Sequence, residues 1–168
     1  GTLNSGESAM STHIHYQHTQ TSPLSLLLVG VAVVMGIAAW TARDAGPVPL
    51  IVGGAALVVL LLAACFHSLT TTVSEAGLQL RYGPIPLFRK HIAPSEIQSL
   101  TASRSSLIDG WGIHYIPWRG WTYNLWGFDC VLIERGERPA IRVGTDDPDG
   151  LAMALRDQLQ NAQTASGS

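Results

Sequence analysis

Residues 24–66 read LSLLLVGVAVVMGIAAWTARDAGPVPLIVGGAALVVLLLAACF, and this stretch decides the fold. It holds two uncharged apolar runs of 19 residues each, 24–42 and 48–66, with Arg43 and Asp44 between them. A helix of that length rises about 28 Å, which is close to the roughly 30 Å hydrocarbon core of a bilayer. The stretch therefore predicts a hairpin of two transmembrane helices.

The alternative is a buried helical pair in the core of a soluble protein. Helices of soluble proteins usually keep a polar face, and neither run has one. A charge at mid-bilayer costs about 2.5 to 3.5 kcal/mol on insertion scales, so the absence of charge favours the membrane. Small residues allow close helix packing. We expect such close packing at Ala32, Gly36, Gly53 and Gly54. These residues serve either the contact between the two helices of the hairpin or contacts with other membrane proteins.

The flanks of the hairpin set the domain organisation. Residues 1–23 are polar and rich in Ser, Thr, Gln and His, which predicts a disordered N-terminal tail. Within it, residues 1–9 are a candidate non-native extension, because Met10 would be a natural start. The rest of the 168 residues has room for one domain of about 100 residues. We place this domain at 67–162 and expect a disordered tail at 163–168.

Cysteine content and the spans bear on the compartment. Cys65 and Cys130 give no disulfide framework, and unpaired thiols fit a reducing compartment. No positively charged segment of a cleavable signal precedes the first run. Because two spans return the chain to its starting side, we expect a multi-pass protein of the inner cell membrane with both termini in the cytoplasm. The charges beside the spans barely discriminate between orientations.

Beyond the second run the pattern changes to short β-branched or alternating stretches separated by turn residues. These predict about seven strands, with antiparallel-type connections that favour a sheet curled into a sandwich or barrel: 68–74, 78–82, 87–92, 97–102, 121–126, 129–135 and 140–143. A helix should follow, because Asp147 and Pro148 suit its first turn. Leu151, Leu155 and Leu159 then recur every four residues and predict a stripe that packs on the core.

Three local stretches add to this order of elements. They are Leu87-Phe88-Arg89-Lys90-His91-Ile92 with Ser95-Glu96-Ile97, then Gly110-Trp111-Gly112-Ile113, and Ile141 to Pro148 (IRVGTDDP) before the helix. With the hairpin, they make the chain resemble the membrane-anchored bacterial pleckstrin-homology-like (PH-like) domains. The resemblance implies an α+β fold of about seven antiparallel strands in a curled sheet or barrel plus one C-terminal helix. It implies binding and scaffolding rather than catalysis.

The densest sequence feature is the stretch 110–126, which holds four of the five tryptophans. Tryptophan and tyrosine suit half-wet apolar surfaces at interfaces and in the headgroup zone. We therefore predict a recognition surface for lipid headgroups or a protein partner at Trp111, Tyr115, Trp118 and Arg119. We favour a core position for the aromatic residues of 121–126, which lie in a predicted strand.

Basic residues are few. Residues 67–168 hold nine Arg and Lys against ten Asp and Glu, so the chain lacks the basic field that nucleic-acid binding requires. Arg81, Arg89 and Lys90 are candidates for contact with anionic headgroups, each worth up to about 1 kcal/mol near such a surface. The alternative reading is solvated charges on strands.

Catalytic motifs are missing from the sequence. It contains no Gly-rich phosphate loop, GxSxG, HExxH or cysteine pair at metal spacing. His13, His15 and His18 read as incidental rather than metal-binding. We therefore expect a non-enzymatic interaction or assembly module, without cofactor or metal, whose partners are the lipid bilayer and other membrane proteins. The alternative is a small membrane-bound hydrolase or sensor built from a second set of residues: His67, His91, His114, Glu96, Asp109 and Asp129.

Overall fold

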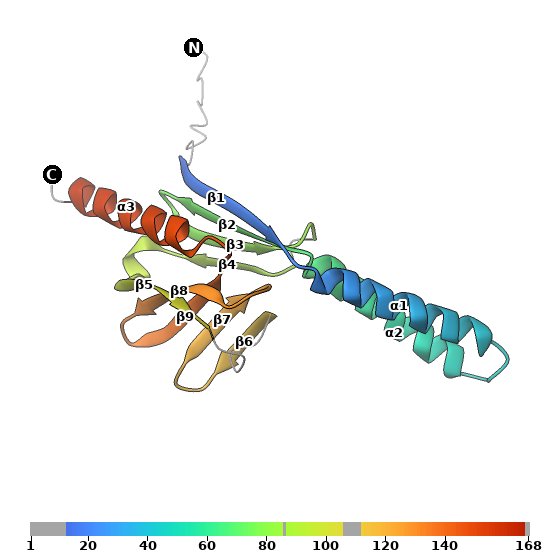
Figure 1. Ribbon diagram of the computed structural model, residues 1–168. Helices are drawn as coiled ribbons and strands as arrows, with labels where there is room; N and C mark the ends of the chain where they lie inside the picture. Colours follow the sequence, from blue (N-terminus) through green and yellow to red (C-terminus); the bar gives the residue numbers. More distant parts are fainter. Residues whose placement is uncertain (1–12, 86, 106–111, 167–168) are drawn as a thin grey trace, which may run out of the picture.

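A computed structural model describes residues 13–85, 87–105 and 112–166 of the chain (Figure 1). Among these residues are a pair of long apolar helices, nine strands in two sheets, and a C-terminal helix. Trp111 and Asp109 lie outside the described residues. The layout of two apolar helices, a β-region and a last helix agrees with the sequence prediction.

The apolar helices are α1 (Leu24–Thr41) and α2 (Val48–Cys65). They pack against each other and project together from the rest of the molecule (Figure 1). Both are long and apolar enough to cross a membrane, and only 11% of the first span and 17% of the second is buried inside the structure. A helical pair in the core of this domain would be mostly buried, so the low burial favours the predicted membrane hairpin.

The first sheet has the order β1-β2-β3-β4, and every pairing is antiparallel. Its strands are β1 (Ile14–Thr21), β2 (Ser68–Ser74), β3 (Gly77–Tyr82) and β4 (Arg89–Ile92). Strand β1 comes before the helices and pairs along its length with β2. The helical hairpin is therefore the connection between two adjacent strands, and the disordered tail predicted at 1–23 is wrong for residues 14–21. We call residues 14–21 and 67–166 together the β-domain.

The side chains of β1 explain why the strand was missed. Its inward-facing positions are Tyr16, His18 and Gln20, so the strand lacks the apolar alternation that marks a half-buried strand. Each of these side chains instead has a polar partner in residues 144–147, just before the last helix. Gln20 Nε2 donates to the Gly144 carbonyl at 2.8 Å, and His18 Nε2 lies 2.5 Å from Asp146 Oδ1. Tertiary hydrogen bonds replace hydrophobic burial here.

The second sheet has the order β5-β8-β9-β7-β6. Its strands are β5 (Ser99–Arg104), β6 (Gly112–Ile116), β7 (Gly120–Asn124), β8 (Asp129–Arg135) and β9 (Arg138–Gly144). The β7–β9 pair is parallel, whereas the other pairs are antiparallel. The 3₁₀ turn η1 (Pro94–Glu96) leads from β4 to β5, which lie in different sheets. The sheets are not closed into one barrel, so the predicted barrel and its all-antiparallel pairing are wrong.

The core lies between the sheets and is covered by α3 (Pro148–Ser166), on the side opposite α1 and α2 (Figure 1). Leu151 and Leu155 are fully buried and Leu159 packs at the edge, so the predicted stripe is confirmed. Helix α3 continues through residues 163–166, where a tail was expected, and that part of the prediction is wrong. The sheets contribute the rest of the core: Leu69, Val73, Leu78, Leu80, Tyr82, Ile92, Val131, Ile133, Ile141 and Val143.

Candidate functional site

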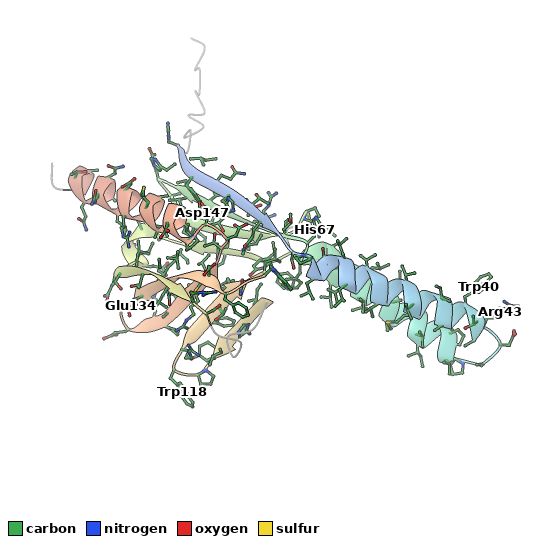
Figure 2. The ribbon with its side chains drawn as sticks, in the orientation of Figure 1. Trp40, Arg43, His67, Trp118, Glu134 and Asp147 are labelled. Carbon is green, nitrogen blue, oxygen red and sulfur yellow. The ribbon has the colours of Figure 1, made fainter. Side chains whose placement is uncertain are left out.

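Hydrogen bonds close the point where the chain enters and leaves the helical hairpin, and we call Ser22, Ser25 and His67 the junction. Figure 2 shows His67 at the base of the helices. The Ser22 N–H donates to the His67 carbonyl at 3.1 Å, which extends the β1–β2 ladder to the helices. The Ser25 hydroxyl lies 3.0 Å from His67 Nδ1, and Ser22 Oγ accepts the Leu24 N–H at 3.1 Å. Ser22 and Ser25 are buried. The junction therefore fixes the direction of the hairpin relative to the β-domain.

The turn between β3 and β4 packs against the end of α2. Gly83 has φ +59°, and a Cβ there would lie 2.5 Å from the carbonyl oxygen of Cys65. Only glycine allows so close an approach of two backbones at a positive φ. The ring of Phe66 contacts Tyr82 and Phe88 with centroid distances of 5.4 and 5.5 Å. The turn is thus held level with the end of the second span.

The β6–β7 hairpin carries the aromatic residues that the sequence singled out. Tyr115 is the cross-strand partner of Trp121, and their ring centroids are 5.4 Å apart. Trp118 lies in the turn, with φ 58° and 96% of its surface exposed. The buried positions of β7 are Thr122 and Asn124 instead of the aromatics, so the expected core position of Trp121 is wrong. Trp121 and Trp126 are exposed, whereas Tyr123 is half-buried and packs against the core, as expected for that stretch.

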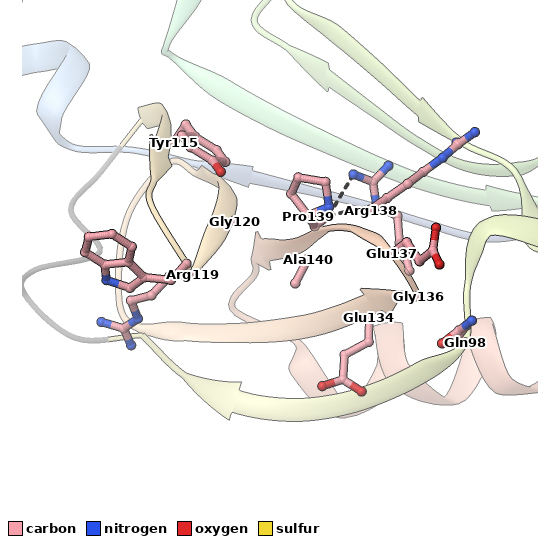
Figure 3. A pocket seen from close by; sticks show the side chains of 12 residues that line it. Gln98, Tyr115, Arg119, Gly120, Glu134, Gly136, Glu137, Arg138, Pro139 and Ala140 are labelled. Carbon is pink, nitrogen blue, oxygen red and sulfur yellow. Dashed lines mark hydrogen bonds between the residues drawn. The ribbon is translucent and has the colours of Figure 1, made fainter.

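A groove of about 410 Å³ lies between this turn and the β8–β9 turn (Figure 3). We call it the Trp118 groove. A Cβ at Gly120 would lie 2.1 Å from the Ala140 carbonyl oxygen, and Arg142 donates to the Arg119 carbonyl, so the two hairpins are held tightly together. Three residues of the predicted recognition surface, Tyr115, Trp118 and Arg119, line this groove together. Its other lining residues come mainly from β8, β9 and their turn: Gln98, Gly120, Glu134, Arg135, Gly136, Glu137, Arg138, Pro139 and Ala140.

A charged cluster supports the floor of the groove. Arg135 and Arg138 both donate to Glu96 Oε2, at 3.1 and 2.8 Å, and Arg135 also donates to the Pro139 carbonyl at 2.8 Å. Burial opposes ionisation of Glu96, but the hydrogen bonds from Arg138 and Arg135 outweigh it and lower the pKa of its carboxyl group. This cluster fixes the β8–β9 turn. Glu134 and Glu137 give the groove negative charge beside its arginines.

The structure separates the three basic residues proposed for headgroup contact. Arg81 on β3 and Arg89 on β4 are direct cross-strand partners, and both are exposed. Lys90 follows Arg89 and therefore points to the opposite face. There it lines a cavity of about 180 Å³ with Tyr82 and Tyr123 among its neighbours. Arg89 also lines this cavity, so the separation is between Arg81 and Lys90, and Arg89 lies next to both.

The small residues of the hairpin fall into two groups. Ala32 is buried, and a Cβ at Gly53 would lie 4.0 Å from Ala39 Cβ on the other helix. A Cβ at Gly36 or Gly54 would meet no atom within 4 Å. Ala32 and Gly53 therefore lie at the contact between the helices, while Gly36 and Gly54 face away from it.

The histidines of the hydrolase alternative lie on separate elements. His67 belongs to the junction, His91 Nε2 donates to the Ala76 carbonyl at 2.9 Å, and His114 lies on β6. The described residues contain no group of three His, Cys, Asp or Glu side chains that could hold a metal ion. In the N-terminal segment, the rings of His13 and His15 are 5.5 Å apart, whereas His18 points to Asp146.

Sequence reasoning missed half of the Trp118 groove. The ERGERP segment, residues 134–139, reads only as a turn, yet it forms the wall opposite Trp118. The signal that could have found it is the alternation of charged residues around Gly136 and Pro139, which exceeds what a plain hairpin turn needs. Residues 134–139 face the β6–β7 hairpin because β7 pairs with β9 in parallel. This pairing joins residues far apart in the chain.

No model of a known protein family matches this chain, and no curated protein matches it. The function is therefore argued from the geometry of the junction, the Trp118 groove and the helices.

Proposed function

We propose that this chain is a non-enzymatic integral membrane protein whose β-domain binds a segment of another membrane protein in the Trp118 groove. The observation that carries the proposal is Trp118 itself, a fully exposed tryptophan held at a positive φ. Strained backbone is retained mainly where function requires it. Exposed tryptophan beside a groove is also typical of the few residues that dominate protein interfaces.

The position and charge of the groove favour a protein ligand over lipid. The open end of the β6–β7 hairpin lies near the membrane helices, because the Asn124 carbonyl accepts the Tyr82 hydroxyl at 3.2 Å. Trp118 is six residues from Asn124, roughly 20 Å along a strand. Figure 2 shows Trp118 away from His67 and the helices. The groove also carries both arginine and glutamate, which suits the mixed polar groups of a polypeptide.

The helical hairpin supports a location in the inner cell membrane. Its two ends lie beside each other in the paired strands β1 and β2, so both emerge on one face of any bilayer that it crosses. We place that face in the cytoplasm, because Cys65 and Cys130 form no disulfide. The PH-like family remains a prediction from the sequence, and the two sheets with a last helix are compatible with such a scaffold.

Anchoring in the membrane plane gives this arrangement its mechanism. A binding surface held at a fixed height above the bilayer meets other membrane proteins at a high effective concentration. A weak intrinsic affinity of the Trp118 groove then suffices for assembly. The hydrogen-bonded junction contributes because it limits the orientations that the β-domain can take.

Affinity purification in mild detergent tests the binding function. The intact chain should retain partner proteins that the Trp118→Ala variant loses, because truncation of an interface centre typically costs about 2 kcal/mol or more, a thirtyfold loss of affinity. Trp126→Ala is the matched control, since Trp126 is also exposed but does not line the groove. Recovery of the same proteins with Trp118→Ala as with the intact chain would contradict the proposal.

Cysteine labelling tests the orientation. Cys65 and Cys130 are buried, so a cysteine placed at Met153 or Asp44 is the reactive thiol of its variant. With both termini in the cytoplasm, an impermeant maleimide should label Asp44→Cys in intact cells and Met153→Cys only after lysis. The reverse pattern would show the opposite orientation.

A further inference from the structure

The turn between β3 and β4 exposes three large apolar side chains close together. Ile85, Leu87 and Phe88 are all exposed, and Leu87 shows 62% of its surface. Single exposed apolar residues are ordinary, but a contiguous group marks a contact surface. The described part of the chain therefore leaves this apolar surface exposed for an external cover.

The location of the turn identifies that cover. Gly83 lies against the backbone carbonyl of Cys65, and Phe88 packs on Phe66, the residue that follows α2. Figure 1 shows the β3–β4 turn beside the start of the helical pair. If α2 crosses the hydrocarbon core, its end lies at the boundary of the headgroup layer, which is roughly 5 to 8 Å thick on each side. The exposed turn then lies within that layer.

A pair of arginines lies next to the turn. Arg81 and Arg89 are opposite each other on β3 and β4, and both are exposed, so the pair concentrates positive charge beside the apolar turn. Arg81 is also opposite Thr70, three residues after His67, about 10 Å along the strand from the junction. An arginine side chain can extend from there back to the headgroups. Arg89 directly follows Phe88.

We propose that Ile85, Leu87 and Phe88 insert into the headgroup layer of the bilayer that α1 and α2 cross, and that Arg81 and Arg89 bind anionic phospholipid there. The turn is a third membrane contact beside the two spans. It fixes the tilt of the β-domain on the surface and enriches anionic lipid around the protein. This inference rests on the proposed membrane span and is independent of the ligand of the Trp118 groove.

Depth-dependent quenching tests the insertion. The full chain carries an environment-sensitive fluorophore on Leu87→Cys or, as control, on Met153→Cys in α3, because both side chains are 62% exposed and the native thiols are buried. In phosphatidylcholine vesicles, lipids brominated high on the acyl chain should quench the probe at residue 87 and leave the probe at residue 153 unquenched. Equal quenching at the two sites would overturn the insertion.

A second arm tests the anionic lipid. At low salt, brominated phosphatidylglycerol should quench the probe at residue 87 in preference to brominated phosphatidylcholine. The preference should correspond to an enrichment of the anionic lipid by about fivefold per arginine. The Arg81→Gln/Arg89→Gln variant should lose this preference. Arg104→Gln/Arg156→Gln removes the same charge from other exposed sites and should keep it. Equal quenching by the two lipids in the intact chain, or a loss of preference in the control, would overturn the arginine site. Partner binding by the Trp118 groove should not change in either variant.

Discussion

The phenol of Tyr16 donates a 2.9 Å hydrogen bond to Asp147 Oδ2, 131 residues further along the chain. The same carboxylate begins α3, because Asp147 Oδ1 accepts the Gly150 N–H at 3.1 Å. One side chain therefore joins the strand before the helical hairpin to the last helix. Strand β1 precedes α1 and α2 in the sequence, yet it completes the β-domain, which is formed mainly by residues that follow these helices.

We expect Tyr16→Phe to lower the free energy of unfolding of the β-domain by about 1 to 2 kcal/mol, because a hydrogen bond to a charged group is lost. Urea unfolding in detergent, followed by tryptophan fluorescence, measures this change. Tyr115→Phe is the control, since Tyr115 is exposed on β6. Equal stability of the Tyr16→Phe variant and the intact chain would show that this hydrogen bond does not hold β1 in place.

Alkaline pH should destabilise the β-domain. Burial raises the pKa of Tyr82 above its usual value, and burial with the hydrogen bond to Asp147 raises the pKa of Tyr16. Below pH about 10 both phenols are protonated in the folded and the unfolded chain. Above it the unfolded chain releases these protons first, so stability falls as the pH rises from 10 towards the folded pKa values.

The free energy of unfolding falls by at most about 1.4 kcal/mol per pH unit because of Tyr82. The contribution of Tyr16 is smaller, because this side chain is partly exposed and water screens its charge. Thermal unfolding between pH 9 and 12 measures this slope. Tyr82→Phe should give a shallower slope than the intact chain. An unaltered slope in Tyr82→Phe would contradict this assignment.

Gly83→Ala should loosen the membrane-facing end of the β-domain. Besides the strain of a positive φ, the new Cβ would collide with the backbone carbonyls of Cys65 and Ala64, and we expect a loss of about 2 to 4 kcal/mol. Gly136→Ala is matched in conformation, with φ +65°, but its Cβ meets the flexible end of Gln98. It should lose about 1 to 2 kcal/mol. Similar losses in urea unfolding of the two variants would show that the contact at α2 is not tight.

Trp118→Gly should separate stability from binding. A non-glycine residue at positive φ costs about 1 kcal/mol or more, and the exposed Trp118 ring buries little surface to offset it. The variant should therefore be as stable as the intact chain or more stable by up to about 1 kcal/mol, while it loses partner proteins. Trp121→Gly, within β7, should lose stability instead. A marked destabilisation in Trp118→Gly would mean that Trp118 supports the fold rather than the interface.

Much of the fold follows from local sequence pattern. The strands 68–74 and 129–135 were predicted with their observed bounds, because β-branched or alternating residues are closed by turn residues at both ends. The stripe of Leu151 and Leu155 likewise predicts the packed face of α3. Tyr115, Trp118 and Arg119 were identified from composition alone, and the structure brings them to one groove.

The sequence by itself determined the two apolar spans, most of the strands and the last helix, because periodicity and the absence of charge are local properties of a chain. Only the tertiary structure decided that β1 exists, that the hairpin is inserted between two neighbouring strands, and that Arg81 lies opposite Arg89 at its base. These features depend on hydrogen bonds and pairings between residues far apart in the chain, such as Tyr16 with Asp147. Side-chain pattern along one segment carries no information about them.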